Sequence, residues 1–133
     1  MNITGRLSSF AKTRIAETFC AMLDGGTVGF YDGDQPSTSD ADIVRQRLII
    51  TVPLPDPAFG KVKNGVAKGT FVGAPSKAIA DGSVNWCRCY DRDGNGVIDG
   101  SVGVGPDFFC DVASTYVEKG GTVVIKSIVY RSE

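Results

Sequence analysis

Residues 86–99 read WCRCYDRDGNGVID, and this stretch decides how the second half of the chain folds. Trp, Tyr, Val and Ile favour strands, and they lie on both sides of a central Gly94-Asn95-Gly96. Gly and Asn tolerate the positive φ angles that tight hairpin turns require. We therefore predict two antiparallel strands that are joined by a turn at these three residues.

Oxygen-bearing side chains in the same stretch have the spacing of an EF-hand calcium loop. The four candidate ligands are Asp91, Asp93, Asn95 and Asp99. Gly96 matches the glycine position of such a loop, but Val102 stands where the loop should end on a bidentate Glu. The flanking residues also have the character of strands rather than of a helix pair. We favour the hairpin and expect no metal, while a calcium site at the four residues stays open as the alternative.

The charge balance of the 133-residue chain argues against two classes of partner. The chain has 14 basic and 15 acidic residues and a net charge of −1, so it offers no basic patch to nucleic acid or to a membrane surface. No apolar run approaches the roughly 20 residues of a membrane span. Residues 1–6 lack the basic and apolar segments of a signal peptide, so we expect the chain to stay in the cytoplasm where it is made.

The sequence contains no histidine. This removes the commonest general base and the commonest metal ligand, and it argues against triad hydrolases and His-bearing zinc sites. No Ser, Cys or Lys nucleophile has a suitable base at local spacing. We predict that the protein is not an enzyme, that it has no catalytic residues and that it binds no cofactor.

Residues 6–23 have the periodicity of a helix. Apolar residues recur there at three- and four-residue steps, at Leu7, Phe10, Ala11, Ile15, Phe19, Met22 and Leu23. Thr4 is a suitable N-cap, and Gly25-Gly26 should stop the helix.

The rest of the chain has the pattern of short strands. Most of its 17 glycines fall between short apolar runs, as expected for strands joined by tight turns. The predicted strands cover residues 27–31, 45–52, 66–72, 83–90, 96–104, 107–112 and 122–131, and the polar residues 34–42 predict an exposed loop of low order. The predicted fold is mainly β, an antiparallel β-sandwich or barrel with one N-terminal α-helix packed on it, as a single domain over residues 1–133.

The chain has four cysteines, at Cys20, Cys87, Cys89 and Cys110. Cys87 and Cys89 share one face of a strand with Cα atoms about 6.5 Å apart and parallel Cβ directions, so we expect no bond between these two. Zinc has weak support, because Cys-x-Cys lacks the paired Cys-x-x-Cys spacing of structural sites. Two alternatives stay open: reduced cysteines buried as small apolar residues, and disulfides that involve any of the four.

Several short motifs follow one another over most of the chain. They are Phe30-Tyr31-Asp32-Gly33 with Pro36, Leu48-Ile49, Asp56-Pro57-Ala58-Phe59-Gly60, Gly65-Val66-Ala67, Trp86 with Arg88, Asp91 with Asp93-Gly94, and Asp99-Gly100-Ser101-Val102-Gly103. In this order, with an N-terminal helix and an apolar C-terminal strand, they resemble a family of small tailed-bacteriophage proteins encoded among virion structural genes. The Asp-Pro-Ala-Phe-Gly motif and the segment from Trp86 to Gly103 are the most distinctive.

The resemblance implies a virion structural protein that is assembled in the host cytoplasm. The leading expectation is a capsid decoration or linking subunit that binds phage capsid or other virion proteins, and the alternative is a neck, collar or tail protein. Self-association is expected, for example as a trimer that matches the local threefold points of a capsid. A particle that persists outside the cell would also permit disulfides that the cytosol forbids.

Two functions of different classes stay open, and one of them is an enzyme that uses a cysteine for redox or hydrolytic chemistry. A calcium-dependent receptor- or carbohydrate-binding β module would use the four oxygen-bearing residues of the hairpin.

Overall fold

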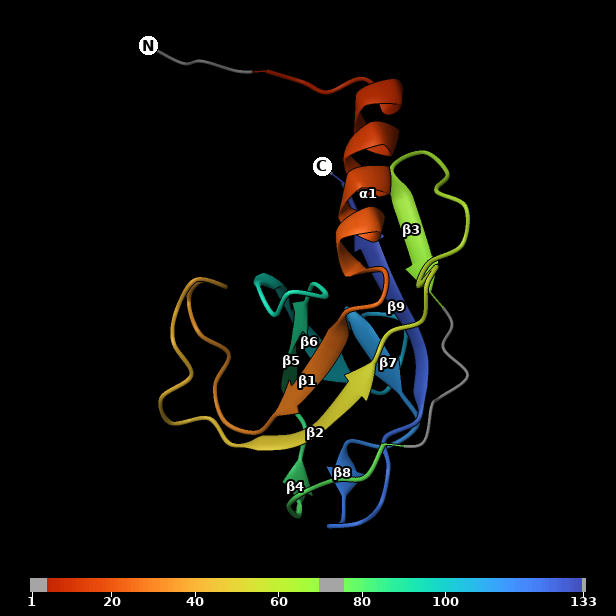
Figure 1. Ribbon diagram of the computed structural model, residues 1–133. Helices are drawn as coiled ribbons and strands as arrows, with labels where there is room; N and C mark the ends of the chain where they lie inside the picture. The colour runs from red at the N-terminus through yellow and green to blue at the C-terminus, as the bar shows by residue number, and fades with distance from the viewer. Residues whose placement is uncertain (1–4, 70–75, 133) are drawn as a thin grey trace.

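The structure is a computed structural model that describes residues 5–69 and 76–132 (Figure 1). Helix α1 (Ser9–Leu23) comes first, and nine strands follow within the described residues. The strands are β1 (Thr27–Tyr31), β2 (Leu48–Pro53), β3 (Val66–Gly69), β4 (Gly82–Ser83), β5 (Trp86–Tyr90), β6 (Gly96–Gly103), β7 (Cys110–Val112), β8 (Tyr116–Val117) and β9 (Ile125–Arg131).

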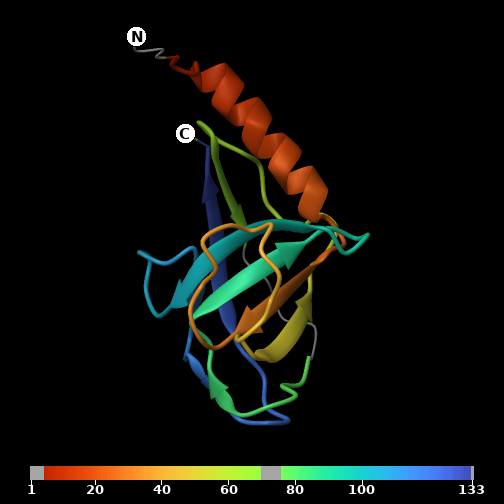
Figure 2. The same ribbon diagram turned by 90° about the vertical axis from the view of Figure 1, so that its left-hand side faces the viewer.

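Seven of the described strands form one curled sheet, in the order β2-β1-β5-β6-β7-β9-β3. Strands β6 and β7 are parallel, and the other neighbours in the sheet are antiparallel. Strands β4 and β8 form a separate antiparallel pair at the end opposite α1 (Figure 1). In the turned view, α1 leans across one end of the curled sheet and its first turns extend past the strands (Figure 2). The prediction of a mainly β fold with one N-terminal helix is confirmed.

Helix α1 begins three residues later than predicted. Its N-cap is Ser8, whose Oγ accepts a hydrogen bond from the backbone N of Ala11 at 3.1 Å. The predicted N-cap, Thr4, lies outside the described residues. The helix ends as predicted, because Gly25 adopts φ +73°, a backbone conformation that favours glycine. Among the residues that the structure describes, no helix is both long enough and apolar enough to span a membrane.

The predicted hairpin is confirmed. Strands β5 and β6 are antiparallel, with Arg88 opposite Asp99 and Cys89 opposite Ile98. In the turn, the backbone N of Asp91 donates to the carbonyl oxygen of Asn95 at 3.0 Å, and Gly94 has φ +86°. The Gly-Asn-Gly segment thus supplies the backbone freedom that the turn uses.

Other strand boundaries differ from the prediction where distant segments bind the backbone. Predicted strand 83–90 is divided, because Val84 N donates to the carbonyl oxygen of Thr115 at 2.8 Å and the chain then crosses to the main sheet. Predicted strand 45–52 begins only at residue 48, because Arg47 N instead donates to the carboxylate of Asp32 at 2.7 Å. Residues 70–72 of the third predicted strand lie outside the described residues.

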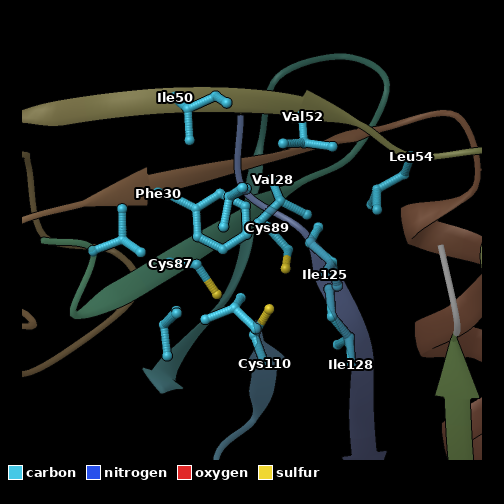
Figure 3. Close-up of a cluster of buried hydrophobic side chains, with 14 of the residues drawn as sticks. Val28, Phe30, Ile50, Val52, Leu54, Cys87, Cys89, Cys110, Ile125 and Ile128 are labelled. Atoms are coloured by element: carbon cyan, nitrogen blue, oxygen red, sulfur yellow. The ribbon is translucent and has the colours of Figure 1, made fainter. Parts of the chain in front are cut away.

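The core lies inside the curl of the sheet (Figure 3). Side chains from β1, β2 and β9 meet there, and Phe30, Ile50 and Ile128 have no exposed surface. Full burial of such a side chain contributes about 1.5–3 kcal/mol to the hydrophobic free energy of folding. The curl therefore brings both edges of the sheet around one shared core and leaves α1 at its rim.

Candidate interaction surface

The first candidate ligand of the calcium alternative, Asp91, shapes the hairpin turn. Its Oδ1 accepts hydrogen bonds from the backbone N of Asp93 and of Asn95, both at 2.9 Å. Its Oδ2 accepts a hydrogen bond from the Asn95 side-chain amide at 3.0 Å. These hydrogen bonds favour the charged form of Asp91 and lower its pKa, and the bond from the side-chain amide of Asn95 has the largest effect.

The last candidate ligand, Asp99, is instead buried in an ion pair with Arg88. The Arg88 Nε lies 2.6 Å from Asp99 Oδ1, and its Nη2 lies 2.9 Å from Asp99 Oδ2. The two side chains are 6% and 4% exposed, and the hydrogen bonds to Asp99 raise the pKa of Arg88. Within residues 5–69 and 76–132, no cluster of three or more acidic or cysteine side chains could hold a metal ion. The structure does not bring the four candidate ligands together.

The same ion pair anchors the polar loop at residues 34–42. Arg88 Nη1 donates to the carbonyl oxygen of Ala41 at 2.7 Å. The backbone N of Asp99 donates to the Oγ of Ser39 at 3.2 Å. The loop that the sequence predicted to have low order is thus tied to β5 and β6 at two points.

The four cysteines are free thiols, and three of them meet in the core. Cys87, Cys89 and Cys110 have no exposed surface, and their sulfur atoms point toward the same region (Figure 3). A hydrogen bond with Cys89 and then burial raise the pKa of Cys87, and burial raises the pKa of Cys110. These thiols act as small apolar core residues. Disulfides that form in an extracellular particle stay a prediction.

An apolar groove of about 490 Å³ lies where side chains of α1, β6 and β9 meet. It is lined by Arg14, Ile15, Thr18, Phe19, Met22, Val97, Ile98 and Tyr130. The rings of Phe19 and Tyr130 stack in it with centroids 3.9 Å apart. The volume falls within the range of about 300–1,000 Å³ that is typical of binding sites.

Helix α1 also leaves large apolar side chains in solvent. Phe10 is 71% exposed, Met22 45% and Ile15 41%. The helix buries Ala16, Phe19 and Leu23 against the body, so Ile15 and Met22 belong to a second stripe beside the buried one. A clustered apolar surface of this kind marks an interaction site more often than isolated exposed residues do.

The predicted helix did not reveal this surface, because its periodic apolar residues were treated as a single series. The sequence does contain a signal for this surface, which is that the apolar residues of α1 cover more of the helix circumference than one buried stripe needs. Ala11, Ile15, Thr18 and Met22 follow steps of four, three and four residues, which defines a seam of its own beside the buried stripe.

The two ends of α1 differ in charge. Its N-terminal half carries the basic residues Lys12 and Arg14, and Arg6 lies just before its first residue. At its C-terminal end, Arg92 of the hairpin turn donates to the carbonyl oxygen of Asp24 at 2.8 Å, so the acidic residues Asp91 and Asp93 of that turn lie nearby. At this C-terminal end Asp24, Asp56, Asp91 and Asp93 outnumber Arg92, so the apolar groove is flanked by a basic end and a net acidic end.

Neither a protein-family model, nor a curated protein, nor a solved structure matches this chain significantly. The surface must therefore be interpreted from its own geometry and from the motifs in the sequence.

Proposed function

We propose that this chain is a structural protein of a bacteriophage virion, and that it works as a decoration or linking subunit on the capsid. The observation that carries the proposal is that apolar side chains are exposed to solvent at both ends of the molecule. At one end they belong to α1, where Ile15 and Met22 border the groove. At the other end Tyr116 of β8 is 56% exposed, and Ile79, shortly before β4, is 63% exposed (Figure 1).

A protein with two adhesive ends can join two neighbours. On a shell, each contact is repeated many times, so modest contacts add up to firm attachment through multivalency. The rigid body between the two ends, held by a buried core and by the Arg88–Asp99 pair, keeps their separation fixed. The motif resemblance to small virion proteins supports the same class of function.

A neck, collar or tail position is the alternative within this class. Such positions form rings of few subunits, whereas decoration of a shell needs many copies. Quantitative mass spectrometry of purified particles decides between them, because it gives the number of copies of this chain per copy of the major capsid protein.

Deletion of the gene from the phage tests the proposal as a whole. We expect particles that lack one protein band and that lose DNA at a lower temperature than wild-type particles. Complementation from a plasmid should restore both the band and the stability. Wild-type particles that never contain this chain would contradict the proposal.

A further inference from the structure

We infer that the groove beside α1 receives α1 of a second copy of this chain, packed antiparallel about a twofold axis that passes between Ile15 and Thr18. This inference deepens the proposed function, because it names the partner of the same surface. It can be tested on the purified chain without any particle.

The spacing of the seam fits a second helix. Ala11, Ile15, Thr18 and Met22 follow the four-three-four steps with which helices pack side by side in a coiled coil. Around the inferred axis, Ala11 faces Met22 of the second copy, and Ile15 faces its Thr18. Each large side chain of the seam then lies opposite a smaller one, which lets two helices approach to the usual 8–10 Å between axes.

The groove provides the second wall that such a helix needs. Val97 and Ile98 of β6 and Tyr130 of β9 line it together with the exposed Ile15 and Met22. A helix that lies on the seam therefore buries its own apolar stripe against both α1 and the hairpin. The symmetry repeats the same contact on the second copy, as in an isologous dimer.

Charge complementarity selects a second copy in the antiparallel direction. The chain is basic at the N-terminal end of α1 through Lys12 and the preceding Arg6, and it is net acidic at the opposite end, where Asp24, Asp56, Asp91 and Asp93 outnumber Arg92. An antiparallel pair brings each basic end to the acidic end of the other copy, and it also opposes the two helix dipoles. A parallel pair would bring like charges together at both ends.

The test measures self-association of the full chain by sedimentation equilibrium from micromolar to millimolar concentration. We expect a species of twice the 14.0 kDa chain mass, with an association that weakens as salt is added. Ile15→Glu and Met22→Glu should each raise the dissociation constant by at least about tenfold, because each places a charge in the apolar seam. Val44→Glu, a matched change at an 81% exposed residue between β1 and β2, should leave it unchanged.

Ile15 and Met22 are 41% and 45% exposed, so the variants should keep the folded structure of the body, which circular dichroism and urea unfolding verify. Cross-linking then tests the direction of the pair. In a Cys20→Ser background, oxidation of an equimolar mixture of Ala11→Cys and Met22→Cys proteins should give a mixed disulfide-linked dimer. Either protein alone should give much less, because residue 11 faces residue 22 only in the antiparallel pair.

Three outcomes would overturn the inference. They are a chain that stays monomeric at millimolar concentration, a dimer that is indifferent to Ile15→Glu and Met22→Glu, and efficient cross-linking of each single-cysteine protein with itself. If the chain is monomeric but Ile15→Glu prevents its attachment to particles, the groove binds the shell instead. The inference then fails while the proposed function stands.

Discussion

At the scale of single residues, the Arg88–Asp99 pair holds parts of the chain that are far apart in sequence. It joins β5 to β6 and fixes the loop at residues 34–42 through Ser39 and Ala41. Burial of two charges costs free energy, and the pair offsets that cost through its bidentate geometry and its further hydrogen bonds. Loss of one partner leaves the other charge buried alone, which is far more costly than loss of an exposed pair.

Arg88→Met should therefore lower the free energy of unfolding by about 3–5 kcal/mol, as measured by urea denaturation at neutral pH. The double variant Arg88→Met/Asp99→Leu should recover part of the loss, because no unpaired charge remains. Arg92→Met is the matched control. Its ion pair with Asp56 has side chains 60% and 59% exposed, so its loss should cost no more than about 1 kcal/mol. Equal effects of the two arginine changes would contradict this account of the pair.

Gly26 is a second residue whose identity is fixed by its surroundings. A Cβ atom at this position would run into the carbonyl oxygen of Tyr90, which belongs to the rigid backbone of β5. Gly26→Ala should destabilise the protein by about 1–3 kcal/mol, since the backbone must shift to make room. In Gly60→Ala, the added Cβ would meet the Lys68 carbonyl oxygen at an ordinary 3.6 Å. Thermal unfolding of both variants should show a clear drop in the melting temperature only for the first.

At the scale of elements, the sequence predicts those features that a few neighbouring residues determine. The hairpin β5–β6 follows from its turn residues, and the end of α1 follows from Gly25. The parallel pairing of β6 with β7 could not be predicted, because only residues 104–109 connect the two strands and parallel neighbours normally need a longer crossover. The exposed stripe of α1 was missed for a related reason. Whether Ile15 faces the body or solvent depends on where the sheet lies, and helical periodicity does not contain that information.

The hairpin turn gives a prediction at this scale. Asp91→Ala should lower the urea midpoint at neutral pH, because three hydrogen bonds within the turn are lost. Asp93→Ala should have little effect, since no hydrogen bond to its carboxylate is seen among the described residues. The hydrogen bonds hold the pKa of Asp91 below 3.8 in the folded state. The stabilisation is therefore complete above the unfolded pKa and is lost as the pH falls through the folded pKa.

Urea unfolding of the wild type and of Asp91→Ala at a series of pH values measures how the stabilisation by Asp91 depends on pH. The difference between the two midpoints should be constant near neutrality and should shrink in acid. A difference that grows as the pH falls would show that the sign of this linkage is wrong. Calcium titration of the same proteins tests the remaining form of the calcium alternative, because any stabilisation by the ion that is lost in Asp91→Ala would locate a site at the turn.

At the scale of the whole molecule, the curl of the sheet determines what is accessible. Cys87 and Cys89 of β5 and Cys110 of β7 lie inside the curl, so they reach solvent only when the strands around the core separate. Cys20 lies on α1 at the rim, where it is partly exposed, and burial raises its pKa from 9.0 to about 11. The four thiols therefore report on two different motions, local exposure of the helix and global opening of the body.

Pulsed alkylation followed by mass spectrometry measures both motions in one experiment. Under native conditions at mildly alkaline pH, Cys20 should react first, more slowly than a free thiol because fewer thiolates form when the pKa is raised. The three core thiols should react together, at a rate that rises with urea in parallel with the unfolding constant. Cys20→Ser removes the fast phase and should leave the slow one unchanged. Core thiols that react as fast as Cys20 without denaturant would mean that the curl opens locally, and the proposed fixed separation of the two exposed apolar ends would then lose its physical basis.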